Sequence, residues 1–149
     1  MQKLSRTTED TEKIAKDFLK TCVNNTNKNS CVVCLHGDLG AGKTTFSKFL
    51  AKELGVKRKV NSPTFVIMKR YEIKSKNNKF KNLYHLDAYR LKNEKELDVL
   101  GWKNIVADPN NLILIEWPEN VKKAIPKKHH KIEILHTKEG HRKFKIKKK

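Results

Sequence analysis

The segment that most constrains the fold is a glycine-rich stretch at residues 37–44, GDLGAGKT. Its spacing, GxxxxGK[ST], lets the backbone wrap closely around phosphate groups with several N–H groups pointing inward. An apolar, β-branched run precedes it at 31–35, and apolar residues at helical spacing follow from 43 to 54, with Gly55 at the expected C-cap. Strand, loop and helix in this order predict a P-loop, with ATP and Mg²⁺ as its ligands.

Two residues at the end of the loop have specific expected roles. Lys43 is expected to reach the β- and γ-phosphates, and the Thr44 hydroxyl to ligate Mg²⁺, while the following helix directs its positive dipole end at the phosphates. The predicted nucleotide contacts from this segment are Asp38, Leu39, Gly40, Ala41, Gly42, Lys43, Thr44 and Thr45.

Two acidic residues follow apolar runs that are typical of buried strands. Asp87 comes after residues 83–86, and Glu116 comes after residues 112–115. Ligands of open α/β sheets lie at the carboxyl edge of the strands, and the metal and the attacking water of a P-loop ATPase need acidic groups there, so we predict that both acids are catalytic. The alternative is that each acid only caps its strand or pairs with Arg90. His85 shares a face with Asp87 and is expected to be partly buried and hydrogen-bonded rather than a metal ligand.

Two further features near this edge leave alternatives open. The loop 61–65, NSPTF, places hydroxyl groups beside a proline, and it can sense a γ-phosphate or be an ordinary turn that enters a strand. Trp117 can be a core anchor or a ring beside the site, and the sequence does not decide between these.

The periodicity along the chain predicts an α/β fold. A mostly parallel central sheet flanked by helices, with an antiparallel hairpin, is expected to form a single domain over residues 1–149. An amphipathic helix is expected over 7–23 with Thr7 or Thr8 as its cap, and short helices over 94–100 and 102–107. The other predicted strands are 64–73 and 80–86, which form the hairpin, and 112–115, 131–136 and 142–147.

The composition is strongly basic, with a formal net charge of +18. Such a charge is expected of a nucleic-acid binder, but 29 of the 34 basic residues are Lys and only five are Arg, the residue favoured for bidentate phosphate and base contacts. Lys and Asn together are enriched by an AT-rich genome, so we interpret most of the charge as solvated surface. The tail 143–149 can still make non-specific, salt-sensitive contacts with RNA.

Apolar runs and cysteines bear on where the protein resides. The longest apolar runs are far shorter than the roughly 20 residues of a membrane span, and residues 1–10 lack the apolar segment of a secretory signal, so a cytoplasmic protein is expected. The cysteines are Cys22, Cys31 and Cys34. Cys31 and Cys34 have CxxC spacing, but strand positions three apart face opposite sides, so all three thiols are expected to be free and structural.

Four collinear motifs make the chain resemble the bacterial TsaE proteins, which are ATPases required for threonylcarbamoyl-adenosine formation in tRNA. The motif HxDxYR followed by IEWPE is far more specific than a P-loop alone, and an early Glu-x-Thr motif is met loosely by residues 9–11. The matching segments are GDLGAGKTTF at 37–46, NSPTF at 61–65, YHLDAYR at 84–90 and IEWPE at 115–119.

The resemblance implies roles for individual residues. Thr44 and Glu116 would ligate Mg²⁺, directly or through water, and Asp87 would either complete the second shell of ligands around the metal or orient the attacking water. Thr11 would approach the adenine of ATP or ADP, and Arg142, which opens the last predicted strand, would reach the nucleotide. It also implies partners: TsaE acts on a complex of TsaD and TsaB, which modifies the tRNA, so tRNA contact would be indirect. ATP hydrolysis by TsaE would reset the TsaD–TsaB complex between turnovers. The loop 62–65 is the expected element whose conformation depends on the nucleotide.

Three other functions remain as alternatives. A small-molecule or nucleoside kinase shares the P-loop but usually needs a basic lid, for which five scattered arginines offer little. A regulatory GTPase is disfavoured because no Asn-Lys-x-Asp or Thr-Lys-x-Asp motif is present. A pure RNA-binding module would depend on charge alone.

Overall fold

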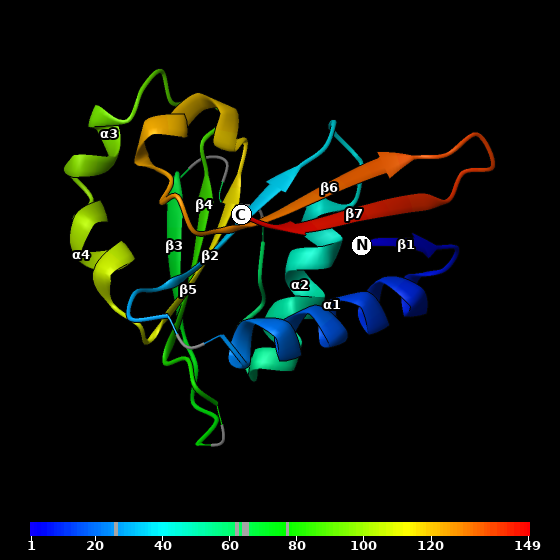
Figure 1. The fold of residues 1–149 in the computed structure, drawn as a ribbon, viewed down its shortest axis with the longest axis horizontal. Helices are drawn as coiled ribbons and strands as arrows, with labels where there is room; N and C mark the ends of the chain where they lie inside the picture. The colour runs from blue at the N-terminus through cyan, green and yellow to red at the C-terminus, as the bar shows by residue number, and fades with distance from the viewer. Residues whose placement is uncertain (26, 62, 64–65, 77) are drawn as a thin grey trace.

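The computed structural model describes residues 1–25, 27–61, 63, 66–76 and 78–149. A seven-stranded sheet runs through it in the order β1-β7-β6-β2-β5-β4-β3 (Figure 1). The strands are β1 (Gln2–Ser5), β2 (Cys31–His36), β3 (Met68–Glu72), β4 (Asn82–Asp87), β5 (Asn111–Glu116), β6 (His130–His136) and β7 (Arg142–Lys148).

The sheet is parallel in its centre and antiparallel towards both edges. Strands β6, β2, β5 and β4 form the parallel centre, whereas β3 pairs antiparallel with β4, and β7 pairs antiparallel with β6 and β1. The predicted α/β fold and hairpin are confirmed, and the description "mostly parallel" fits the central strands only. The central residues of these strands, 31–35 in β2 and 112–115 in β5, are all apolar because helices cover both of their faces.

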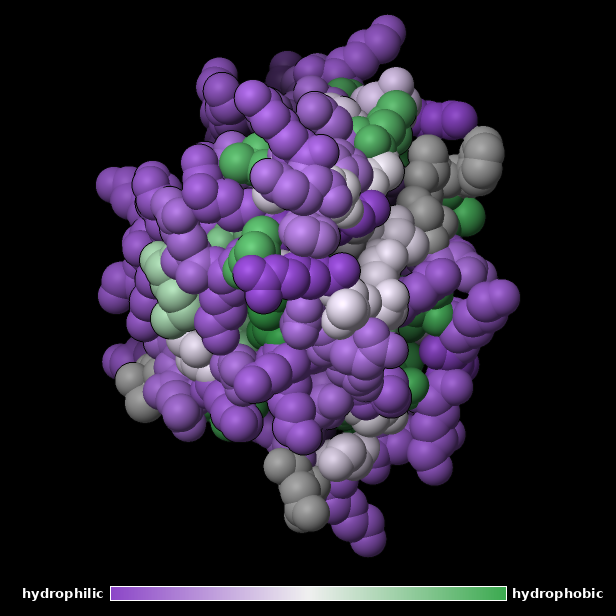
Figure 2. Space-filling view, turned by 90° about the vertical axis from the view of Figure 1, so that its right-hand side faces the viewer, coloured by the Kyte–Doolittle hydropathy of each residue, from purple (hydrophilic) through white to green (hydrophobic). Residues whose placement is uncertain are grey.

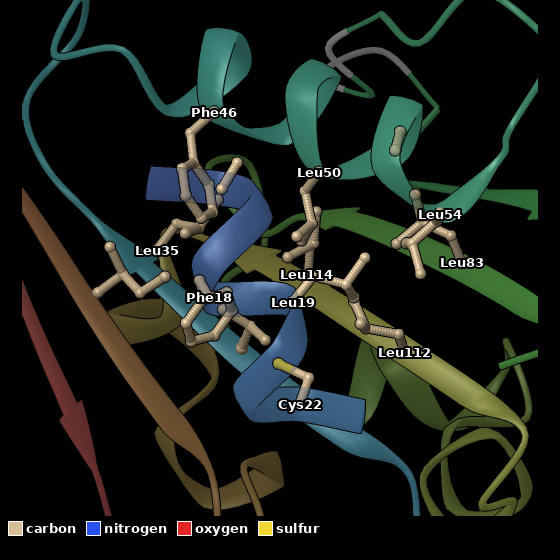
Figure 3. Packing of buried hydrophobic residues seen from close by; sticks show 14 of the residues in the cluster. Phe18, Leu19, Cys22, Leu35, Phe46, Leu50, Leu54, Leu83, Leu112 and Leu114 are labelled. Atoms are coloured by element: carbon tan, nitrogen blue, oxygen red, sulfur yellow. The ribbon is translucent and has the colours of Figure 1, made fainter. Parts of the chain in front are cut away.

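Two helix layers cover the sheet (Figure 1). Helices α1 (Thr8–Val23) and α2 (Lys43–Leu54) pack on one face, where alternate strand residues such as Leu35 and Leu114 are buried with them (Figure 3). On the other face, α3 (Lys95–Asp98), α4 (Trp102–Ala107) and the 3₁₀ segment η1 (Pro118–Ala124) cover residues such as Val32 and Ile113. This alternation follows from the period of two along a strand.

Several element boundaries differ from the sequence-based expectation. Strand β1 was not predicted, because it is mostly polar and is fixed by pairing with β7. Segment η1 was not predicted either; it begins soon after the buried strand β5. The helix predicted over 94–100 is shorter, Lys95–Asp98. Helix α1 begins as expected with Thr7 as its N-cap, in a capping box completed by Asp10.

The two cysteines of the CxxC segment face opposite sides of the sheet, as predicted. Cys31 is buried in the core beneath α1 and α2, and Cys34 in the opposite core. Burial raises the pKa of Cys34 to about 12, whereas a hydrogen bond from the Cys22 thiol, with a further contribution from His130, lowers the pKa of Cys31 to about 6. All three thiols are free.

One face of the molecule is strongly hydrophilic. On the face in Figure 2, hydrophilic side chains predominate and apolar residues appear only in small patches. Among the described residues, no helix has both the length and the apolar character that a bilayer span requires.

Candidate nucleotide-binding site

The glycine-rich segment lies at the carboxyl edge of the sheet, between the end of β2 and the start of α2. Gly40 and Gly42 have φ values of +77° and +110°, which side chains rarely adopt, and Gly42 is the residue from which α2 begins. Gly37 is required for a different reason: a Cβ there would lie 2.8 Å from the carbonyl oxygen of Ile134 in β6. The loop therefore depends on glycine for both its turns and its close packing.

Lys43 places its ammonium group inside the loop. Its Nζ donates a hydrogen bond to the carbonyl oxygen of Gly37 at 2.5 Å and lies 4.2 Å from the centroid of the Trp117 ring. Lys43 is only 7% exposed, so its ammonium group is largely shielded from solvent, and its position over the Trp117 ring stabilises the charge. Trp117 is thus a ring beside the candidate site, and it also contacts Tyr89 with ring centroids 5.1 Å apart.

The two predicted acids lie side by side at the same edge. Asp87 and Glu116 are the last residues of β4 and β5 and are direct partners in the parallel register. Glu116 is also the register partner of Leu35 in β2, the strand that leads into the loop. Both acids are buried, and Asp87 Oδ1 accepts a hydrogen bond from the backbone N–H of Tyr89 at 3.0 Å.

Glu116 has unused hydrogen-bonding capacity. It is 3% exposed, and its Oε1 has no hydrogen-bond partner among the described residues. A buried carboxylate oxygen without a hydrogen bond is costly, and a catalytic role or a bound water or ion can account for such an oxygen. Glu116 and the half-buried Thr44 are the residues here whose carboxylate and hydroxyl oxygens could hold Mg²⁺.

His85 differs from the sequence-based expectation. It is 0% exposed rather than partly buried, and neither ring nitrogen has a hydrogen-bond partner in the described part of the chain. Its Nε2 lies 3.8 Å from Glu116 Oε1. The expectation was wrong because His85 lies on β4 with its side chain covered, and only the pairing of β4 with β5 brings it to Glu116.

A pocket of about 260 Å³ opens beside the start of α2. It brings together Thr11, Gly42, Thr45 and Arg142, which come from α1, the loop, α2 and β7. Thr11 is buried, and its Oγ1 lies 2.7 Å from Ser5 Oγ. The sequence-based reasoning missed the other lining residues, which are Ser5, Arg6, Thr7, Thr8 and Gly140. The Thr7-x-x-Asp10 capping pattern locates the start of α1, but no sequence signal places that start beside the glycine loop.

The remaining loop residues form its outer rim. Asp38, Leu39 and Gly40 are exposed, whereas Ala41 is buried. The carbonyl oxygen of Gly40 lies 3.1 Å from His136 Nε2 and 3.3 Å from Arg142 Nη2, so residues of β6 and β7 contact the outer part of the loop. His136 was not predicted as part of the site.

Part of the predicted site is not described. In the loop 62–65, expected to sense the γ-phosphate, only Pro63 lies among the described residues.

Known proteins match this chain over the segments that form the site. A sequence model of the family described as threonylcarbamoyl adenosine biosynthesis protein TsaE matches residues 5–144. The chain belongs to the TsaE family. The TsaE match contains the whole loop, both edge acids, Thr11 and Arg142. This family acts in the biosynthesis of threonylcarbamoyladenosine in tRNA.

Individual TsaE relatives are similar over most of this chain. The tRNA threonylcarbamoyladenosine biosynthesis protein TsaE of Bacillus subtilis is 42% identical over 103 residues, which are 69% of this chain and 60% of that protein. The protein of the same name from Rickettsia typhi is 39% identical over 116 residues, covering 77% and 75% of the two chains. The crystal structure of Bacillus subtilis YdiB has a TM-score of 0.73 at 30% identity and covers 97% and 82% of the chains.

Proposed function

We propose that this TsaE-family chain is a P-loop ATPase that binds ATP or ADP with Mg²⁺ and supports threonylcarbamoyl-adenosine formation in tRNA. The observation that carries the proposal is that a buried cation and a buried carboxylate both lie at the carboxyl edge of the sheet. The buried Lys43 ammonium lies over Trp117, the residue that follows the buried carboxylate of Glu116. The site thus has a buried cation for phosphate and a buried carboxylate whose Oε1 accepts no hydrogen bond among the described residues.

The phosphate end of the nucleotide would lie between the loop and the edge acids. Lys43 is held by Gly37 inside the loop, so it is positioned for the β- and γ-phosphates without a search through rotamers. Thr44 and Glu116 would hold Mg²⁺, which when bound neutralises negative charge on the phosphate oxygens. Asp87 is buried beside Glu116 and would orient the attacking water.

The nucleoside end would lie in the pocket of about 260 Å³ beside α2. Thr11 supports this assignment because its buried hydroxyl lines that pocket with Gly42 and Thr45, the residues on either side of the Lys43–Thr44 pair. Arg142 lines the same pocket and contacts the loop at Gly40, so it can respond to a bound nucleotide.

The proposed partners are the TsaD and TsaB proteins, with tRNA approached through their complex. The chain would not itself transfer the threonylcarbamoyl group; its hydrolysis would reset the complex between turnovers, in the cytoplasm. Family membership in tRNA threonylcarbamoyladenosine biosynthesis supports this assignment. Because the chain spans 60% of the Bacillus subtilis relative's length, the relatives' activities and partners are carried over only as part of this proposal.

The proposal is tested by calorimetric nucleotide binding and by phosphate release from the purified protein, with and without TsaD and TsaB. We expect Mg²⁺-dependent binding of ATP in preference to GTP, and hydrolysis that rises when both partners are present. Glu116→Gln should reduce hydrolysis more than binding, because it removes the carboxylate charge at the metal without removing the phosphate contacts.

Glu119→Gln is the matched control. Glu119 lies three residues further on, is exposed, and pairs with His36 at 2.8 Å, so the same substitution there should leave hydrolysis unchanged. Equal losses in the two variants would contradict the assignment of Glu116. Phosphate transfer to a nucleoside, with no response to TsaD and TsaB, would contradict the proposed function and favour a kinase.

A further inference from the structure

A second polar cluster lies at the opposite end of the parallel strands from the glycine loop. Cys22 belongs to the last turns of α1, Cys31 is the first residue of β2, and His130 is the first residue of β6. All three side chains are buried, and Figure 3 shows Cys22 on the inner side of α1 among the core residues. Neither the glycine loop nor the edge acids contribute to this cluster.

The three side chains converge on one point. One ligand atom from each, the two sulfurs and a ring nitrogen, lie within 4.8 Å of one another. Zinc ligands at bond lengths of about 2.3 Å for sulfur and about 2.0 Å for nitrogen lie about 3.5 to 3.8 Å apart around a tetrahedral ion. Only a small contraction would therefore bring these atoms to zinc-binding distances.

His130 provides an independent observation. The side chain is 3% exposed, and its Nε2 has no hydrogen-bond partner among the described residues. The ring is held edge-on against Phe18 at a centroid distance of 5.3 Å, and Phe18 lies one helical turn before Cys22 on α1. A buried imidazole with a fixed orientation and an unpartnered nitrogen is suited to bind a metal ion.

We propose that Cys22, Cys31 and His130 bind one Zn²⁺ ion. Both thiols would lose their protons and the imidazole would remain neutral, so the charges of the two thiolates and the ion cancel. An electrically neutral centre is much less costly to bury than any of its charges alone. Thiolate and imidazole ligands are those that Zn²⁺ prefers over the oxygen ligands used by Mg²⁺.

A water molecule would complete the tetrahedral coordination, because this cluster supplies three protein ligands. Cys31 and His130 also line a pocket of about 10 Å³. That volume is close to the minimum for a single water molecule, which can complete a tetrahedral ion with three protein ligands. The ion would join α1 to two neighbouring strands of the sheet, so its expected effect is a gain in stability.

The test adds Zn²⁺ to zinc-free protein in a buffer that contains excess Mg²⁺. The Mg²⁺ occupies the proposed site at Glu116, so that this site does not compete for Zn²⁺. We expect one Zn²⁺ per chain by competition with a chromogenic chelator, and a rise in Tm. Cys22→Ala and Cys31→Ala should each weaken Zn²⁺ binding by about a hundred-fold or more, because a lost thiolate removes both charge and coordination. Cys34→Ala is the matched control, since Cys34 is equally buried on the other face of the sheet, and it should retain wild-type affinity.

Substitution by Co²⁺ gives a measurement that needs no variant. Thiolate-bound Co²⁺ in the wild-type chain should show sulfur-to-metal charge-transfer absorption and the intense visible bands of a tetrahedral ion. The proposal is overturned if that absorption is absent, if less than one Zn²⁺ binds per chain, or if Cys34→Ala loses as much affinity as Cys31→Ala. A Cys22–Cys31 disulfide in protein prepared under air with Zn²⁺ present would overturn it as well.

Discussion

Gly42 connects the conformation of the loop to its binding function. Its φ is +110°, and a Cβ added there would lie 3.0 Å from both Cδ and Nε of Arg142. Gly42→Ala therefore has two effects: it strains the backbone at the start of α2, and it forces either Arg142 or the loop to move.

The two effects have different magnitudes and can be separated. A non-glycine residue in such a backbone region costs about 1–3 kcal/mol, offset by about 0.4–1 kcal/mol from the reduced entropy of the unfolded chain. We expect Gly42→Ala to lower the free energy of unfolding by about 1–2 kcal/mol. If the shift removes one hydrogen bond to a phosphate, worth about 1.5–3 kcal/mol, nucleotide affinity should fall about 10- to 150-fold.

Gly101→Ala is the matched control. Gly101 has φ of +74°, and a Cβ there would meet nothing within 4 Å. It should lower stability, measured by urea unfolding, by about 1 kcal/mol and leave ATP affinity, measured by calorimetry, unchanged. Wild-type ATP affinity in Gly42→Ala would refute the reasoning, as would an equal loss of affinity in Gly101→Ala.

Three other perturbations are expected to have defined effects. Lys43→Ala or Thr44→Ala should abolish calorimetric binding of Mg-ATP, because phosphate charge and metal lose their fixed partners; unchanged affinity would contradict the site. Asp10 accepts hydrogen bonds from the backbone N–H groups of Arg6 and Thr7, and these bonds, chiefly the one from Arg6, lower the pKa of Asp10 from the ordinary 3.8. The ionised carboxylate therefore stabilises the fold above pH 3.8, and this stabilisation is lost as the pH falls through the lowered pKa. Asp10→Asn should thus be less stable than wild type at neutral pH, with the difference in urea unfolding shrinking below pH 3.8; a pH-independent difference would argue against this origin.

The centre of the fold could be predicted because its sequence patterns are local. The apolar run before the loop, the glycine spacing and the helix cap at Gly55 lie within one continuous segment, and each restricts the backbone directly. The edge acids Asp87 and Glu116 were located by the same means, since each follows an apolar strand.

Features that depend on pairing between distant segments could not be predicted. Strand β1 is polar and forms only because β7 pairs with it, and the burial of His85 depends on the pairing of β4 with β5. The same applies to Cys22 and His130, which no sequence spacing relates and which only the packing of α1 on β2 and β6 brings together.

The claim that this chain acts in tRNA modification is tested most directly in a bacterial cell depleted of its own TsaE. The measured quantity is the threonylcarbamoyl-adenosine content of the tRNA, by mass spectrometry, after expression of this chain or of Lys43→Ala at matched levels. We predict that the wild-type chain restores the modification and that Lys43→Ala does not. A well-expressed wild-type chain that leaves the tRNA unmodified, or full restoration by Lys43→Ala, would contradict the proposed function.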